Sequence, residues 1–213
     1  MLNDLIIGRD GAEALAQLIP QYHPNLLHLE IKGNNIDSEG FEMIFMALMH
    51  CPGLLTIQAE WNNLGSSATG LAALLYLLRN LRFVELVDLK NNKLTHQHAE
   101  LIAEIIRINN RSLKVIDLRW NEIGEVGAQA IFPALAFNAH LKSLPLEDNR
   151  ISSSTLLQFA DLLRNPSRGT LPLTAPKQQE RVIPESYYPI SEGDYPSMDA
   201  QLKTAQLRGK IES

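Results

Sequence analysis

The sequence has few aromatic residues, which make up 6% of its 213 positions and include only two tryptophans. Aliphatic side chains must therefore supply most of the core, and a hydrophobic content of 45% is enough for one sizeable domain. There is also only one cysteine, Cys51, which excludes an intramolecular disulfide framework. The cysteine content thus favours a reducing, intracellular compartment.

Positive charge and long apolar runs are scarce as well. Lysine and arginine number 19 against 24 aspartates and glutamates, and the net charge is -5. Because nucleic acid and anionic membranes select basic surfaces, neither is expected as a partner. No run approaches the roughly 20 apolar residues that cross a bilayer, and the first residues do not resemble a signal peptide or a mitochondrial presequence. The sequence predicts a cytoplasmic protein.

Signatures of catalysis are missing too. The sequence contains no phosphate-binding glycine loop, no GxSxG and no HExxH. Its six histidines are scattered, and the one local pair, His96 and His98, has no third ligand at a suitable spacing. We therefore predict no catalytic, cofactor-binding or metal-binding residues, and a protein that is not an enzyme.

What the sequence does contain is an internal repeat anchored on five asparagines, Asn34, Asn62, Asn92, Asn121 and Asn149, which are 28, 30, 29 and 28 residues apart. Apolar residues stand eight, five and three positions before each asparagine and two after it: Leu26, Leu29, Ile31, Ile36; Leu54, Ile57, Ala59, Leu64; Val84, Val87, Leu89, Leu94; Leu113, Ile116, Leu118, Ile123; and Leu141, Leu144, Leu146, Ile151. The alternation predicts one short parallel strand per unit with one face buried. We interpret the asparagines as structural residues that bond backbone groups of neighbouring turns.

The second half of each unit has helical spacing, as in Gly127, Ala128, Ile131, Phe132 and Leu135. In the second unit the helical frame is displaced by two residues, to Gly70 and Leu71, which explains the spacing of 30. A strand and a helix cannot bury their apolar faces alone, so units of this kind must stack on one another.

The ends of the array are predicted to be incomplete. Residues 7–19 fit the helical half of a repeat, so the chain is expected to begin within a strand, and such an end invites self-association. We assign 1–173 to a repeat domain with a partial first repeat, five full repeats and a rudimentary capping strand at 171–173. Residues 174–213 are predicted to be a proline-containing, disordered tail with a short helix at 198–213.

The pattern LxxLxLxxN followed by a full helix resembles the ribonuclease-inhibitor subfamily of leucine-rich repeats. The resemblance implies an α/β solenoid, a horseshoe arc with a parallel sheet on its concave side and helices on its convex side, that binds another protein. The strings LEIKGNN, QAEWNNLG, VDLKNNKLTHQHAE and IDLRWNEIG are similar to repeats of a centrosomal-linker family, which implies a scaffold at the centrosome or basal body. A GTPase-activating protein shares the subfamily, so regulation of a small GTPase or a ribonuclease-like enzyme is the alternative.

Both tryptophans, Trp61 and Trp120, occupy the same repeat position, two strands apart and therefore roughly 10 Å from each other. Exposed aromatic and arginine side chains dominate protein interfaces. The predicted protein-binding patch on the concave face comprises Trp61, Lys90, Asn91, Asp117, Arg119 and Trp120. The alternative is that each indole covers the strand-end loop of its own repeat and that the charges pair with one another.

Overall fold

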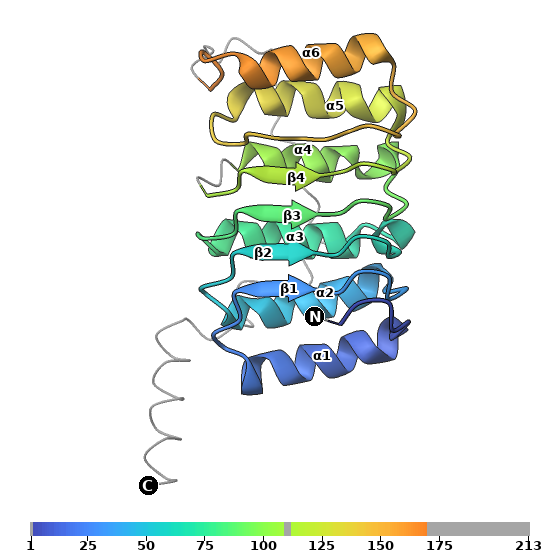
Figure 1. Cartoon of the computed structure of the whole chain (residues 1–213), viewed down its shortest axis with the longest axis vertical. Helices are drawn as coiled ribbons and strands as arrows, with labels where there is room; N and C mark the ends of the chain where they lie inside the picture. The colour runs from blue at the N-terminus through green and yellow to red at the C-terminus, as the bar shows by residue number, and fades with distance from the viewer. Residues whose placement is uncertain (1, 109–111, 170–213) are drawn as a thin grey trace, which may run out of the picture.

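The computed structural model describes residues 2–108 and 112–169, in which helices alternate with short strands along the chain (Figure 1). The α-helices are α1 (Gly8–Tyr22), α2 (Ser38–Ala47), α3 (Thr69–Asn80), α4 (Ala99–Arg107), α5 (Gly124–Phe137) and α6 (Ser153–Arg164). The strands are β1 (His28–Glu30), β2 (Thr56–Gln58), β3 (Leu86–Asp88) and β4 (Val115–Asp117), and short 3-10 helices are η1 (Leu48–His50), η2 (Leu64–Ser66) and η3 (His96–His98). Within the described ranges, each segment with the predicted helical spacing coincides with one of these helices.

The strands form one parallel sheet in the order β1-β2-β3-β4, with equivalent residues of successive repeats in register, such as Leu29 opposite Ile57. Figure 1 shows the helices as a second layer along one side of this sheet. Each helix contacts the helix of the next repeat, from α1 to α6. The repeats therefore stack in chain order, as the sequence predicts.

The prediction of one strand per unit is wrong for the fifth unit, which contributes only an isolated bridge between Val115 and Ser143. The backbone still follows β4, since the amide of Leu118 donates to the carbonyl of Pro145 at 3.0 Å. Pro145 has no N–H to donate in return, so the ladder is interrupted at the place where a strand would form.

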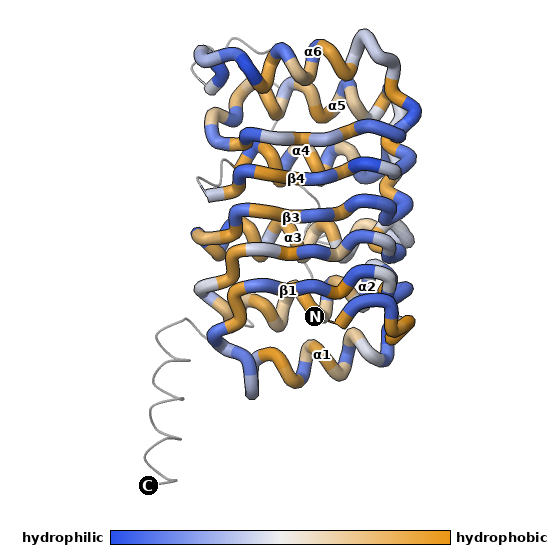
Figure 2. The backbone as a smooth tube through the Cα atoms, viewed as in Figure 1, coloured by the Kyte–Doolittle hydropathy of each residue, from blue (hydrophilic) through white to orange (hydrophobic). Residues whose placement is uncertain are grey.

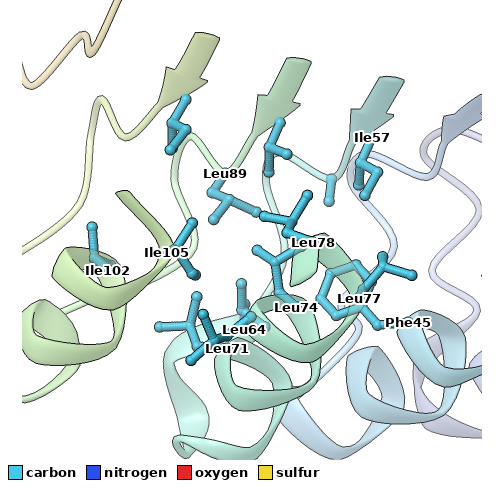
Figure 3. Packing of buried hydrophobic residues seen from close by; sticks show 14 of the residues in the cluster. Phe45, Ile57, Leu64, Leu71, Leu74, Leu77, Leu78, Leu89, Ile102 and Ile105 are labelled. Carbon is cyan, nitrogen blue, oxygen red and sulfur yellow. The ribbon is translucent and has the colours of Figure 1, made fainter. Parts of the chain in front are cut away.

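The core lies between the sheet and the helices. Of the apolar positions eight, five and three residues before the five asparagines and two after them, all are buried except Leu26 and Ile151, which are half-buried in the first and last full units. Figure 3 shows Ile57 and Leu89 from the sheet side facing Leu74, Leu78 and other residues of the helices. Each repeat packs one apolar face against the next repeat, so the stacked repeats share one continuous apolar core.

The five repeat asparagines join the repeats through buried hydrogen bonds. Asn62 Nδ2 donates to the carbonyls of Ala59 and Glu60 in its own loop and to that of Ile31 in the preceding repeat, at 3.1, 3.2 and 2.9 Å. Its Oδ1 accepts from the amides of Asn34 and Ile36, at 3.1 and 3.0 Å. The other four asparagines make bonds of the same kind, and all five are buried. Their predicted structural role is confirmed.

At the N-terminal end, residues 2–4 extend alongside β1, and the amides of Leu2 and Asp4 donate to Glu30 and Lys32. The domain bounds 1–173, with a partial first repeat, stay a prediction. Leu5 and Ile6 are 58% and 74% exposed beside this edge. Self-association through this end stays a prediction, and the predicted cap at 171–173, the tail at 174–213 and its helix at 198–213 lie outside the described residues.

The helices carry both polar and apolar residues. Figure 2 shows hydrophobic and hydrophilic segments alternating along α1 and α6, as expected for helices with one buried face. Among the residues that the structure describes, no helix is both long enough and apolar enough to span a membrane.

We predict that Asn62→Ala lowers the free energy of unfolding by about 2 to 4 kcal/mol, because the substitution leaves several buried backbone groups without partners. Urea unfolding followed by circular dichroism measures this change. The matched control is Asn63→Ala, in which a half-buried neighbouring asparagine without a side-chain hydrogen bond in the described structure is removed. Similar losses for the two variants would contradict the structural role of Asn62.

A buried histidine caps η3, the short helix that leads directly into α4. The Thr95 amide donates to Nδ1 of His98 at 3.0 Å, and the two residues form a capping box. Burial is the main cause that lowers the pKa of His98 below its ordinary value of 6.5. The lowered pKa favours the neutral form of His98 at pH 7.5, and protonation would abolish the acceptor that Thr95 uses.

Because the pKa of His98 is lower in the folded than in the unfolded chain, the unfolded chain binds more protons between the two pKa values. The stability that His98 contributes is complete above about pH 6.5 and declines as the pH falls through that window. We expect His98→Gln, which keeps a capping-box residue that does not titrate, to lose less stability than wild type between pH 7.5 and 5. Thermal unfolding at both pH values tests this, and the exposed His96→Gln serves as the control.

Candidate functional site

The six residues of the predicted patch lie where β2, β3 and β4 end. Asp117 is the last residue of β4, and the other five follow the strands within four residues. Residues such as Gln58 and Asp88 alternate with the buried Ile57 and Val87, so they point away from the helices. We call this side the open face of the sheet, and the six predicted residues the tryptophan patch.

The two indoles of the tryptophan patch are in contact. Their ring centroids lie 5.4 Å apart with an interplanar angle of 87°, an edge-to-face pair. Trp61 is 49% and Trp120 is 47% exposed. The separation of roughly 10 Å that strand spacing predicts is wrong for the rings, because the side chains lean toward each other across the intervening repeat.

Trp120 has a second contact, since its Nε1 donates to Asp148 Oδ2 at 2.5 Å. Asp148 occupies the same repeat position in the fifth unit as the two tryptophans do in the second and fourth. The hydrogen bond and the edge-to-face contact hold the indole of Trp120 from two sides. The tryptophan pair is thus an ordered surface feature that exposes about half of each residue.

The backbone at this repeat position is left-handed in every full unit. The φ angles are +68° at Gly33, +60° at Trp61, +51° at Asn91, +57° at Trp120 and +60° at Asp148. Glycine, asparagine and aspartate adopt this conformation most readily. For a bulky side chain it costs on the order of 1 kcal/mol or more, so both tryptophans stand where the backbone disfavours them.

The charged residues of the tryptophan patch form ion pairs within their own repeats. Arg119 donates from Nε and Nη2 to the Asp117 carboxylate at 3.0 and 2.6 Å, and Lys90 Nζ lies 3.5 Å from Asp88 Oδ2. The hydrogen bond and charge of Asp117 raise the pKa of Arg119, with Glu147 and Asp88 contributing at longer range. The alternative that these charges pair with one another is therefore confirmed for Arg119 and Lys90.

These pairs have a physical reason in the sheet register. Asp88 and Asp117 are opposite each other on β3 and β4, and like charges in that arrangement repel. Arg119 and Lys90 each supply a compensating charge. Asp117 is buried, which makes its bidentate partner more important than an exposed one would be.

Two acidic residues beside the tryptophan patch are not among its six predicted members. Asp148 holds Trp120, as described above, and Glu60 directly precedes Trp61 on the open face. Glu60 Oε2 is buried and accepts no hydrogen bond within the described part of the chain. The repeat columns indicate the position of Asp148, whereas the burial of Glu60 Oε2 has no signal in the sequence.

Other sites offer less chemistry. A groove of about 740 Å³ lies between α1 and α2 and is lined by both acidic residues and methionines such as Met43 and Met46. Cys51 is buried, and burial raises the pKa of its thiol. In residues 2–108 and 112–169, no three histidine, cysteine, aspartate or glutamate side chains are grouped to hold a metal ion.

Comparison of the sequence with known proteins identifies its repeats. The family model described as Leucine Rich repeat matches residues 22–45 and 109–132. Leucine-rich repeat-containing protein 45 of Gallus gallus is 32% identical over 106 residues, which are 50% of this chain and 16% of that protein. NACHT, LRR and PYD domains-containing protein 14 of Homo sapiens is 27% identical over 147 residues, or 68% of this chain and 13% of that protein. The chain thus spans under one fifth of the length of either relative.

Solved structures share the fold. The Actin-Binding Site 2 domain of leiomodin-1 aligns with a TM-score of 0.61 and 15% identity, covering 74% of this chain and 88% of that one. The tropomodulin C-terminal domain of Caenorhabditis elegans aligns with a TM-score of 0.53 and 15% identity, covering 71% and 90%. The family match and the repeat sequence show that the chain contains leucine-rich repeats, and the solved structures share its fold.

Proposed function

We propose that the chain is a non-catalytic protein-interaction module and that its partner binds on the open face of the sheet, the concave side of a solenoid of the ribonuclease-inhibitor type. The observation that carries the proposal is the tryptophan pair. The two tryptophans of the chain are half exposed, contact each other at 5.4 Å and adopt a left-handed backbone. Large aromatic anchors of this kind supply much of the binding energy in protein interfaces.

Stability alone does not account for this arrangement. Asn91 occupies the same repeat position between the two tryptophans with a φ of +51°, and asparagine adopts that conformation at lower cost. A tryptophan there adds backbone strain and exposes apolar surface to water. Burial of that surface in an interface would offset this unfavourable free energy. The tryptophan pair is therefore better explained by a partner than by the fold.

The resemblance to leucine-rich repeat-containing protein 45 supports a more specific proposal, in which the module belongs to a scaffold of the centrosome or basal body in the cytoplasm. A tagged chain would then concentrate at centrosomes. Regulation of a small GTPase or a ribonuclease-like enzyme is the alternative, and it would be favoured by a captured partner of that class whose turnover the chain changes.

We expect the double substitution Trp61→Ala, Trp120→Ala to weaken partner binding by at least about 30-fold, because truncation of an interface anchor costs 2 kcal/mol or more. Affinity capture from cell extract, followed by titration with the purified partner, measures the loss. Circular dichroism and the melting temperature should change little, because neither tryptophan is part of the buried core.

A second double variant, Trp61→Asn, Trp120→Asn, distinguishes a loss of binding from a loss of fold. Asparagine suits the left-handed backbone, so this variant should melt at or above the wild-type temperature while partner binding stays lost. The control substitution is Phe83→Ala, which removes an exposed aromatic residue, 59% accessible, that precedes β3. Wild-type affinity in both tryptophan variants would rule out the tryptophan patch as the binding site.

A further inference from the structure

The chemistry of the partner can be inferred from which charges near the indoles are already paired. Arg119 makes a bidentate contact with Asp117. The negative charges of Glu147 and Asp88 also interact with it and raise its pKa. Lys90 is paired with Asp88. The two cations of the tryptophan patch are therefore compensated within the molecule, and an acidic partner would have to compete with these carboxylates for them.

The acidic residues around the indoles are less well compensated. Glu60 has a buried carboxylate oxygen that accepts no hydrogen bond within the described ranges. Glu147, which is exposed, follows Arg119 by one repeat in the same column. Asp148 accepts the hydrogen bond of a neutral indole, which leaves its negative charge in place. Available charge beside the tryptophan pair is thus negative.

The open face as a whole has the same sign. Its two charged columns and the tryptophan column contain six carboxylates and three cationic side chains, an excess of three negative charges: Glu30, Glu60, Asp88, Asp117, Glu147 and Asp148 against Lys32, Lys90 and Arg119. A face with this balance attracts cationic groups and slows the approach of anionic ones.

We propose that the tryptophan patch binds an arginine side chain from a basic segment of the partner protein. Tryptophan has the strongest cation-π interaction of the aromatic residues, and a guanidinium can stack on an indole face while it donates hydrogen bonds to a carboxylate. Glu60, adjacent to Trp61, is the counter-ion once its side chain turns so that the buried Oε2 reaches the surface. This inference rests on the proposed function, because it assigns the chemistry of the partner to the same surface.

The position of both tryptophans within the tryptophan patch provides a direct assay, since the intrinsic indole fluorescence of the full chain reports on this surface alone. The probe is the acetylated and amidated pentapeptide Gly-Arg-Gly-Arg-Gly, and the matched control peptide carries citrulline, a neutral isostere, in place of each arginine. We expect the arginine peptide to bind at least about threefold more tightly than the citrulline peptide. Added salt should reduce this preference.

Two glutamate variants test the counter-ion. Glu60→Gln should reduce the preference for arginine to less than about twofold, whereas Glu13→Gln, the same charge change on the exposed surface of α1, should leave it unchanged. Equal binding of the two peptides, or no fluorescence change with either peptide up to its solubility limit, would overturn the inference.

These results are separable from those that test the proposed function. If the tryptophan variants lose their protein partner but the wild type shows no arginine preference, the open face binds a partner of other chemistry. If the arginine preference holds and the tryptophan variants still bind the captured partner, that partner docks elsewhere.

Discussion

The buried asparagine of each repeat is the constraint on which the other features depend. Its amide donates to the carbonyl two residues earlier and to a carbonyl of the preceding repeat, so the chain must turn sharply after the strand. The turn places the residue before the asparagine in a left-handed conformation and directs its side chain to the surface. One buried hydrogen-bonding group thus fixes the stacking of the repeats and the surface position at which the tryptophans stand.

Most of the fold was predictable because repetition supplies the same evidence five times. The positions of buried residues such as Ile57 and Leu89 follow from periodicity, since a strand of period two and a helix of period 3.6 must face a common core. The exception is local. Pro145 removes a single backbone donor, and the fifth unit loses its strand although its apolar pattern is intact.

The candidate site was predictable in its columns but not in its side-chain geometry. Strand spacing gives the separation of Trp61 and Trp120 along the backbone, whereas the contact at 5.4 Å depends on rotamers that no repeat pattern encodes. The left-handed backbone did have a signal, because Gly33, Asn91 and Asp148 in the same column all favour it. The capping role of His98 was hidden for a different reason: glutamate or glutamine is the usual residue at that position of a capping box.

Lys90 and Arg119 could serve either the stability of the sheet or the binding of a partner. The sequence suggests them as binding residues because arginine is frequent in interfaces. In the structure they compensate Asp88 and Asp117, which the sheet register places opposite each other, and Asp117 is too buried to remain without a partner. Their first role is therefore to make this part of the sheet stable. What remains beside the indoles is aromatic surface and negative charge. In the binding mode that we propose, recognition therefore depends more on what Trp61 and Glu60 can accept than on what Arg119 can donate.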